Sequence, residues 1–189
     1  METTRAFVAV ELGGGATSVL ERVIKELKAN TSGVRWSRRE QLHLTLKFVG
    51  DVDNRELPRL CDSVRAACAA CPPFSLQLRG LGAFPKNKPP RVLWVGVEEG
   101  TQELRGLAER LDQQLAELGV PRETRLFTPH LTLGRVGRGA DMSQLEPAIA
   151  AMSERVALRC EINDIILMAS LKQQAEMIYE PIDTVELEG

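Results

Sequence analysis

Two short motifs contain both histidines of the chain. His43 and His130 are the only histidines among 189 residues, and each is followed by Leu-Thr-Leu. Chance explains this repetition poorly, because the two copies lie in distant parts of the sequence. An imidazole has an ordinary pKa near about 6.5, so two of them can divide acid and base work near neutral pH. The repetition therefore predicts a catalytic pair.

Each motif is expected to form a β-strand. Side chains alternate between the two sides of a strand, so each histidine shares a side with the threonine two positions later. The motif leucines then point to the other side, where they anchor the strands in the core. This arrangement leaves His43 with Thr45, and His130 with Thr132, facing one shared space.

Such a space fits the cleavage of a phosphodiester. A base removes a proton from the attacking water while an acid protonates the departing ribose oxygen, and each contributes about 10² to 10⁴ in rate. The hydroxyls of Thr45 and Thr132 would donate hydrogen bonds to the phosphoryl oxygens and hold the phosphorus between the imidazoles. From the residues alone either histidine can be the acid, because the two motifs are equivalent.

The fifth position after each histidine differs, being Phe48 in the first motif and Arg135 in the second. Arg135 is suited to a bidentate contact with phosphate, and Phe48 to stacking on a nucleobase. Strict alternation, however, places both side chains opposite their histidines. Arg135 joins the site if the strand twists or bulges at Gly134. Phe48 has no such glycine beside it, and packing in the core is the alternative for it.

The elements that must position these residues follow from hydrophobic periodicity. Helical spacing predicts helices at 16–29, 54–70 and 102–118, and a short one ending near residue 152. The first helix would be capped by Thr17 or Ser18, and the last by Asp141 or Ser143. Alternating or continuous apolar runs predict strands at 5–12, 34–37, 42–49, 74–81, 91–98, 131–136, 156–169 and 177–187.

Two irregular segments are also expected. The run at 156–169 should be interrupted near Asn163-Asp164, and the proline-rich segment 84–90 should be a mobile loop.

The order of these elements favours an α+β protein with mainly antiparallel sheets over a doubly wound parallel one. Strand, helix, strand and motif strand in residues 5–49 are loosely repeated as strand, helix and motif strand in residues 91–136. We therefore expect a single bilobal domain over residues 1–189. Each lobe would supply one motif, with helices outside and a central cleft between the lobes.

Composition narrows the class of protein. With 43% hydrophobic and 26% charged residues the chain resembles an ordinary globular protein, and its net charge of −2 argues against a broad basic face for long nucleic acid. No run approaches the about 18 apolar residues of a membrane span, and no export signal is visible, so we expect a cytoplasmic protein without a membrane partner. Four cysteines are expected to be thiols, and two histidines far from them predict no metal site and no cofactor.

At these residues the chain resembles the two-histidine phosphoesterase superfamily, which is marked by a pair of H-x-[ST] motifs. Within that superfamily it looks like the bacterial and archaeal RNA 2′,3′-cyclic phosphodiesterases. The similarity extends to R-A-F-V-A-V at the start, Trp36 ahead of the first motif, and R-V-L-W-V-G before the second. It implies two pseudo-twofold related lobes and metal-independent hydrolysis of a terminal 2′,3′-cyclic phosphate to a 2′-phosphate.

The resemblance also implies a role for each site residue. His43 would be the acid on the leaving 3′ oxygen, and His130 the base that activates water. Phosphate would be bound by Thr45, Thr132 and Arg135, with a nucleobase against Phe48. The expected partner is an RNA 3′ end or a nucleotide with a 2′,3′-cyclic phosphate, and the expected oligomeric state is a monomer.

Two alternatives stay open. A 2′-5′ RNA ligase, or a related cyclic nucleotide phosphodiesterase, would use the same acid and base, because substrate choice lies in the loops. A non-catalytic nucleotide-binding module would share the fold but is expected to have lost a motif histidine or threonine. Both motifs are intact here.

Overall fold

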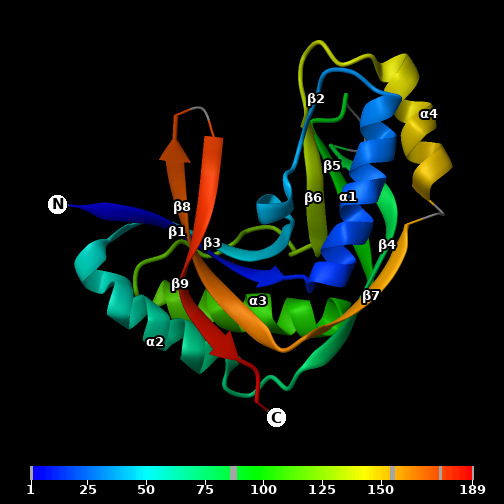
Figure 1. Cartoon of the computed structure of the whole chain (residues 1–189). Coiled ribbons are helices and arrows are strands. Elements are labelled where there is room, and N and C mark those ends of the chain that lie inside the picture. The colour runs from blue at the N-terminus through cyan, green and yellow to red at the C-terminus, as the bar shows by residue number, and fades with distance from the viewer. Residues whose placement is uncertain (1, 86–88, 154–155, 175, 189) are drawn as a thin grey trace.

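The computed structural model describes residues 2–85, 89–153, 156–174 and 176–188. It consists of two antiparallel sheets with helices on their outer sides (Figure 1). The four-stranded sheet has the order β3 (His43–Asp53), β1 (Thr3–Glu11), β8 (Asp164–Gln173) and β9 (Glu176–Glu186). The five-stranded sheet has the order β2 (Val34–Trp36), β6 (His130–Val136), β5 (Val92–Glu99), β4 (Phe74–Phe84) and β7 (Ala157–Ile162). The predicted α+β class is confirmed.

The four α-helices of the described residues cover the two sheets in pairs. On the five-stranded sheet lie α1 (Gly14–Ala29) and α4 (Met142–Ser153), whereas α2 (Leu57–Cys68) and α3 (Thr101–Ala116) pack beside the four-stranded sheet (Figure 1). Each segment that carries a motif thus contributes a helix to the sheet of the other motif. The helix that follows β1 covers the sheet of the second motif, and the helix that follows β5 contacts β3 of the first.

One continuous core joins the two sheets. Helical spacing puts Leu20, Ile24 and Leu27 of α1, like the leucines of α3, on the buried side of each helix. These side chains belong to the same hydrophobic cluster as the inward residues of both sheets. The motif leucines are part of it, and none is more than 4% exposed: Leu44, Leu46, Leu131 and Leu133. The prediction that they anchor the motif strands is confirmed.

Several predicted boundaries shift because of pairing between strands. The strand expected at 42–49 continues to Asp53, because β1 pairs with it along its whole length. The expected interruption at Asn163 is the point where the chain leaves one sheet for the other, since β7 and β8 belong to different sheets. Two further elements are short 3₁₀ helices, η1 (Arg39–Gln41) and η2 (Asn54–Glu56), the second of which replaces the start of the helix predicted at 54–70.

The helix caps were partly predicted. The Asp141 carboxylate accepts a hydrogen bond from the Ser143 N–H at 2.9 Å, at the start of α4. The cap predicted at Thr17 or Ser18 is wrong, because α1 begins at Gly14 without a side-chain cap. The Thr17 hydroxyl donates instead to the preceding carbonyls of Leu12 and Gly13, at 3.2 Å from each.

Three further expectations concern the proline-rich loop, the cysteines and the absence of a membrane span. The loop predicted at 84–90 contains residues 86–88, which lie outside the described residues. All four cysteines are free thiols, as expected. Among the described helices, none combines the length and the apolar character needed to cross a membrane.

Candidate active site

The two motif strands meet although they belong to different sheets. Each histidine is the first residue of its strand, His43 in β3 and His130 in β6. The two strands are in contact with each other. The fold therefore brings together two segments that are far apart in the sequence.

A β-bulge at the same place in both motifs decides which side chains face the histidines. In β3, Thr45 pairs with Ala9 and Lys47 with Val8, so Leu46 has no partner of its own. An extra residue shifts the alternation by one position. The next residue, Lys47, is therefore buried with the leucines, and Phe48 returns to the side of His43.

The second motif has the same irregularity. Thr132 pairs with Trp94 and Gly134 with Leu93, which leaves Leu133 as the extra residue. Gly134 is buried, and a Cβ there would lie 3.0 Å from Val34 Cγ1 and 3.1 Å from Arg35 O. A glycine suits this position because β2 approaches so closely, and the bulge returns Arg135 to the side of His130.

The bulges settle where the fifth residues lie. Phe48 is 65% exposed, so the alternative that it packs in the core is wrong. Its ring centroid is 6.3 Å from that of Phe7, which is itself 5.0 Å from the ring of His43. Arg135 is also exposed, whereas Thr45 and Thr132 are half-buried. Each motif strand thus presents its histidine, threonine and fifth residue on one side.

His43 lies in an apolar environment. Its ring is 5.0 Å from the ring of Phe7 and 5.1 Å from that of Tyr179, which meets it edge-on. The buried Nδ1 atom has no hydrogen-bond partner within the described residues. Burial lowers the pKa of His43 to about 4, instead of the ordinary value assumed from the sequence. The imidazole is therefore neutral at pH 7 in the free protein.

His130 has a defined polar contact instead. Its Nδ1 lies 2.7 Å from the carbonyl oxygen of Thr128. A carbonyl can only accept, so Nδ1 carries a proton, and in the neutral ring the lone pair is therefore on Nε2. The ring meets Phe84 edge-on at 5.2 Å and Trp94 at 6.2 Å. This tautomer suits His130 to accept a proton at Nε2.

The aromatic rings around the histidines were not predicted as site residues. Phe7 and Trp94 lie on β1 and β5, which pair with the motif strands, and only knowledge of that pairing would have identified them. Tyr179 comes from β9, and no local pattern in the sequence connects it with His43. Phe7 packs with Ala9, Ile166 and Met168 in a small second cluster, against which Tyr179 lies.

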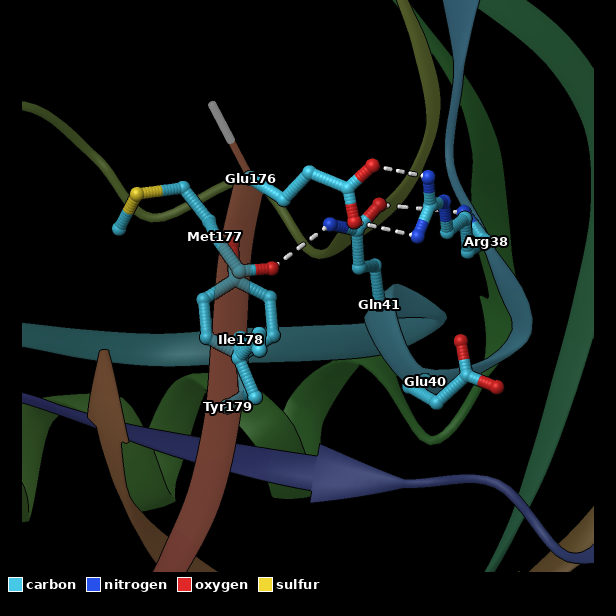
Figure 2. Close-up of a pocket in the computed structure, with 7 residues that line it drawn as sticks. All are labelled: Arg38, Glu40, Gln41, Glu176, Met177, Ile178 and Tyr179. Carbon is cyan, nitrogen blue, oxygen red and sulfur yellow. Dashed lines mark hydrogen bonds and ion pairs between the residues drawn. The ribbon is translucent and has the colours of Figure 1, made fainter. Parts of the chain in front are cut away.

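A small pocket borders the His43 side of the site (Figure 2). The Arg38 guanidinium forms an ion pair with Glu176, and the Gln41 side-chain amide donates to the carbonyl of Met177 at 3.0 Å. These contacts hold the turn before His43 against β9, which carries Tyr179. The pocket has a volume of about 230 Å³ and is lined by Arg38, Glu40, Gln41, Glu176, Met177, Ile178 and Tyr179.

A buried lysine links the first motif to the segment before the second. Lys47 is only 2% exposed. Its Nζ lies 2.7 Å from Asp112 Oδ1 of α3 and 2.7 Å from the carbonyl of Pro121. Asp112 also accepts from the Glu123 N–H at 2.9 Å. A lysine in a strand is ordinarily exposed. Lys47 is buried because the bulge at Leu46 turns its side chain to the side of the leucines.

Comparison with known proteins places the chain in a family. The model of the 2′-5′ RNA ligase superfamily matches residues 17–174. A protein from Aquifex aeolicus (strain VF5) named RNA 2′,3′-cyclic phosphodiesterase is 30% identical over 190 residues, covering 100% of both chains. A protein of the same name from Methanothermobacter thermautotrophicus is 32% identical and covers 97% of this chain and 98% of its own.

Solved structures share the fold. A crystal structure of TT0787 from Thermus thermophilus superposes with a TM-score of 0.82 at 26% identity, covering 98% of both chains. E. coli LigT complexed with 3′-AMP superposes with a TM-score of 0.77 at 24% identity over 100% of both chains. Both histidine motifs lie inside the matched residues, and the chain belongs to the 2′-5′ RNA ligase superfamily of two-histidine phosphoesterases.

Proposed function

We propose that this protein is an RNA 2′,3′-cyclic phosphodiesterase that hydrolyses a terminal cyclic phosphate to a 2′-phosphate. The observation that carries the proposal is the matched pair of bulged strands in contact, each presenting a histidine, a threonine and a fifth residue on one side. Relatives that match nearly the whole chain bear the same name. Two imidazoles supply both proton transfers, so the proposed reaction needs no metal ion.

His130 acts as the base in this mechanism. Its Nε2 takes a proton from a water molecule, whose oxygen attacks phosphorus opposite the 3′ oxygen. The new P–O bond forms as the P–O3′ bond breaks, and the phosphate stays on the 2′ oxygen. The hydrogen bond from Nδ1 to Thr128 supports this role, because it fixes the tautomer and stabilises the imidazolium that forms.

His43 acts as the acid and must carry a proton when the 3′ oxygen leaves. Burial keeps it neutral in the free protein. A phosphate anion beside the ring favours the charged form and raises the pKa, so the proton arrives with the substrate. Thr45, Thr132 and Arg135 bind the phosphoryl oxygens, and the exposed ring of Phe48 stacks on the terminal nucleobase.

The proposal extends to the setting of the reaction. We infer a monomer that acts as one bilobal unit on RNA 3′ ends in the cytoplasm. The continuous core joining both sheets supports the single unit, and the four free thiols fit a reducing compartment.

The experiment uses a short RNA with a 2′,3′-cyclic end, with and without EDTA. We expect a 2′-phosphate product at a rate that EDTA leaves unchanged, identified by ³¹P NMR and mass spectrometry. A 3′-phosphate product would mean that the 2′ oxygen leaves instead. No turnover on cyclic ends, together with joining of RNA ends into a 2′-5′ linkage, would favour the ligase alternative. Binding of cyclic ends with neither reaction would favour the non-catalytic one.

A further inference from the structure

Two arginines face each other across neighbouring strands beside the proposed site. Arg35 of β2 lies directly opposite Arg135 of β6 in the antiparallel ladder. Directly opposite side chains share one side of a sheet, with Cβ atoms about 4.5 to 5.5 Å apart. The neighbours of Arg35 turn the other way, since side-chain atoms of Val34 and Trp36 crowd the buried side of Gly134. Arg35 therefore lies on the side of Arg135 and His130.

Neither guanidinium of this pair has a hydrogen bond or an ion pair with any residue that the structure describes. Elsewhere in the same sheet, two exposed arginines are matched by carboxylates of β5. Arg79 lies 3.0 Å from Glu98, and Arg159 forms an ion pair with Glu99. Like charges placed directly opposite each other are destabilising in a sheet. The Arg35–Arg135 pair thus forms a local positive site in a chain whose net charge is −2.

We propose that Arg35 binds the phosphodiester on the 5′ side of the terminal nucleotide, so that the site holds an RNA chain and not only a cyclic mononucleotide. This inference rests on the proposed function. A cyclic phosphate is a diester with one negative charge, which one guanidinium, Arg135, balances. The second guanidinium is then available for a second anion on the same side of the sheet, and the next phosphodiester along an RNA is such an anion, with oxygens that suit bidentate binding.

The test compares two substrates in the Arg35→Gln variant: 2′,3′-cyclic AMP, and a trinucleotide with a 2′,3′-cyclic end. We expect kcat/KM for the trinucleotide to fall roughly 10-fold to 100-fold, as for a hydrogen bond to a charged group. Turnover of cyclic AMP should be unchanged. The salt dependence of trinucleotide binding should weaken by about one phosphate contact.

The matched control is Arg105→Gln, which removes the same charge from an exposed position on α3. It should leave both substrates unaffected. Equal losses on both substrates would place Arg35 on the cyclic phosphate and overturn the proposal, as would no loss on either. If the wild-type protein turned over neither substrate, the proposed function would fail by itself. Fluorescence anisotropy would then measure binding of a labelled trinucleotide 2′-phosphate to both proteins. Weaker binding by Arg35→Gln would support the role of Arg35, and unchanged binding would overturn it.

Discussion

The two histidines occupy the same motif with the same bulge, but their surroundings differ. The ring of His43 lies between Phe7 and Tyr179, and its Nδ1 has no hydrogen-bond partner among the described residues, whereas the Nδ1 of His130 donates to the Thr128 carbonyl. The motif therefore supplies the imidazole and the strand geometry, and neighbouring elements decide what each imidazole does. For His43 these are β1 and β9, and for His130 the segment that leads into β6.

The largest expected effect comes from removing either imidazole. We expect His43→Ala and His130→Ala each to lower kcat on a cyclic RNA end by about 10² to 10⁴. The rates of the two variants should differ on a phosphodiester with a p-nitrophenolate leaving group, because this group leaves without being protonated. His43→Ala should then regain most of the wild-type rate, because only the acid is missing, whereas His130→Ala should stay slow. The opposite pattern in steady-state assays would exchange the two roles.

The link between the two motif regions can be broken at Asp112. Asp112→Asn removes the nearer carboxylate from the buried Lys47 ammonium and leaves the exposed Glu123 at 3.7 Å, which costs about 3 to 5 kcal/mol of unfolding free energy for a buried pair. It also loosens the segment that leads to Thr128. Urea denaturation measures the loss. The control is Asp62→Asn in the exposed pair with Arg65, expected to cost about 1 kcal/mol or less. A small loss in both variants would remove Lys47 from this linking role.

The lowered pKa of His43 predicts a loss of stability in acid. The unfolded chain binds a proton at the ordinary pKa near 6.5, but the folded protein binds it only near pH 4. Stability is thus fully present above about pH 6.5 and falls until about pH 4, by roughly 3 kcal/mol. Urea denaturation of His43→Asn at pH 7 and pH 4.5 should show a smaller difference than wild type. His130→Asn keeps His43 and should retain the wild-type difference. An equal difference between the two pH values in all three proteins would show that His43 does not cause the loss of stability.

A smaller effect should accompany ligand binding. Because an anion raises the pKa of His43, binding of a nucleotide 2′-phosphate should take up at most one proton near pH 7. Calorimetry in buffers of different ionisation enthalpy measures this uptake. His43→Gln should abolish most of it. Uptake that persisted in this variant would assign the proton to another group, such as the phosphate itself.

The sequence predicted the individual helices and strands better than the contacts between them. The repeated His-Leu-Thr-Leu motif indicated four candidate site residues, and periodicity indicated the helices and most strands, because both signals are read directly along the chain. Pairing between strands is not local, so the bulge at Leu46, the inward turn of Lys47 and the contact of Tyr179 with His43 were invisible. The same limit explains why an ordinary pKa was assumed for His43, since its burial depends on Phe7 from another strand.

Because α1 and α3 each cover the sheet of the other motif, the two segments that carry the motifs cannot be separated without exposing apolar surface. A fragment containing only one of these segments would have strands whose apolar side is covered, in the whole protein, by a helix of the other segment. Two copies of that fragment would bury their leucines only by trading helices, as domain-swapped partners do. The arrangement resembles an element exchanged between domain-swapped partners, but within one polypeptide, so separating the two motif segments would expose apolar surface on both sheets.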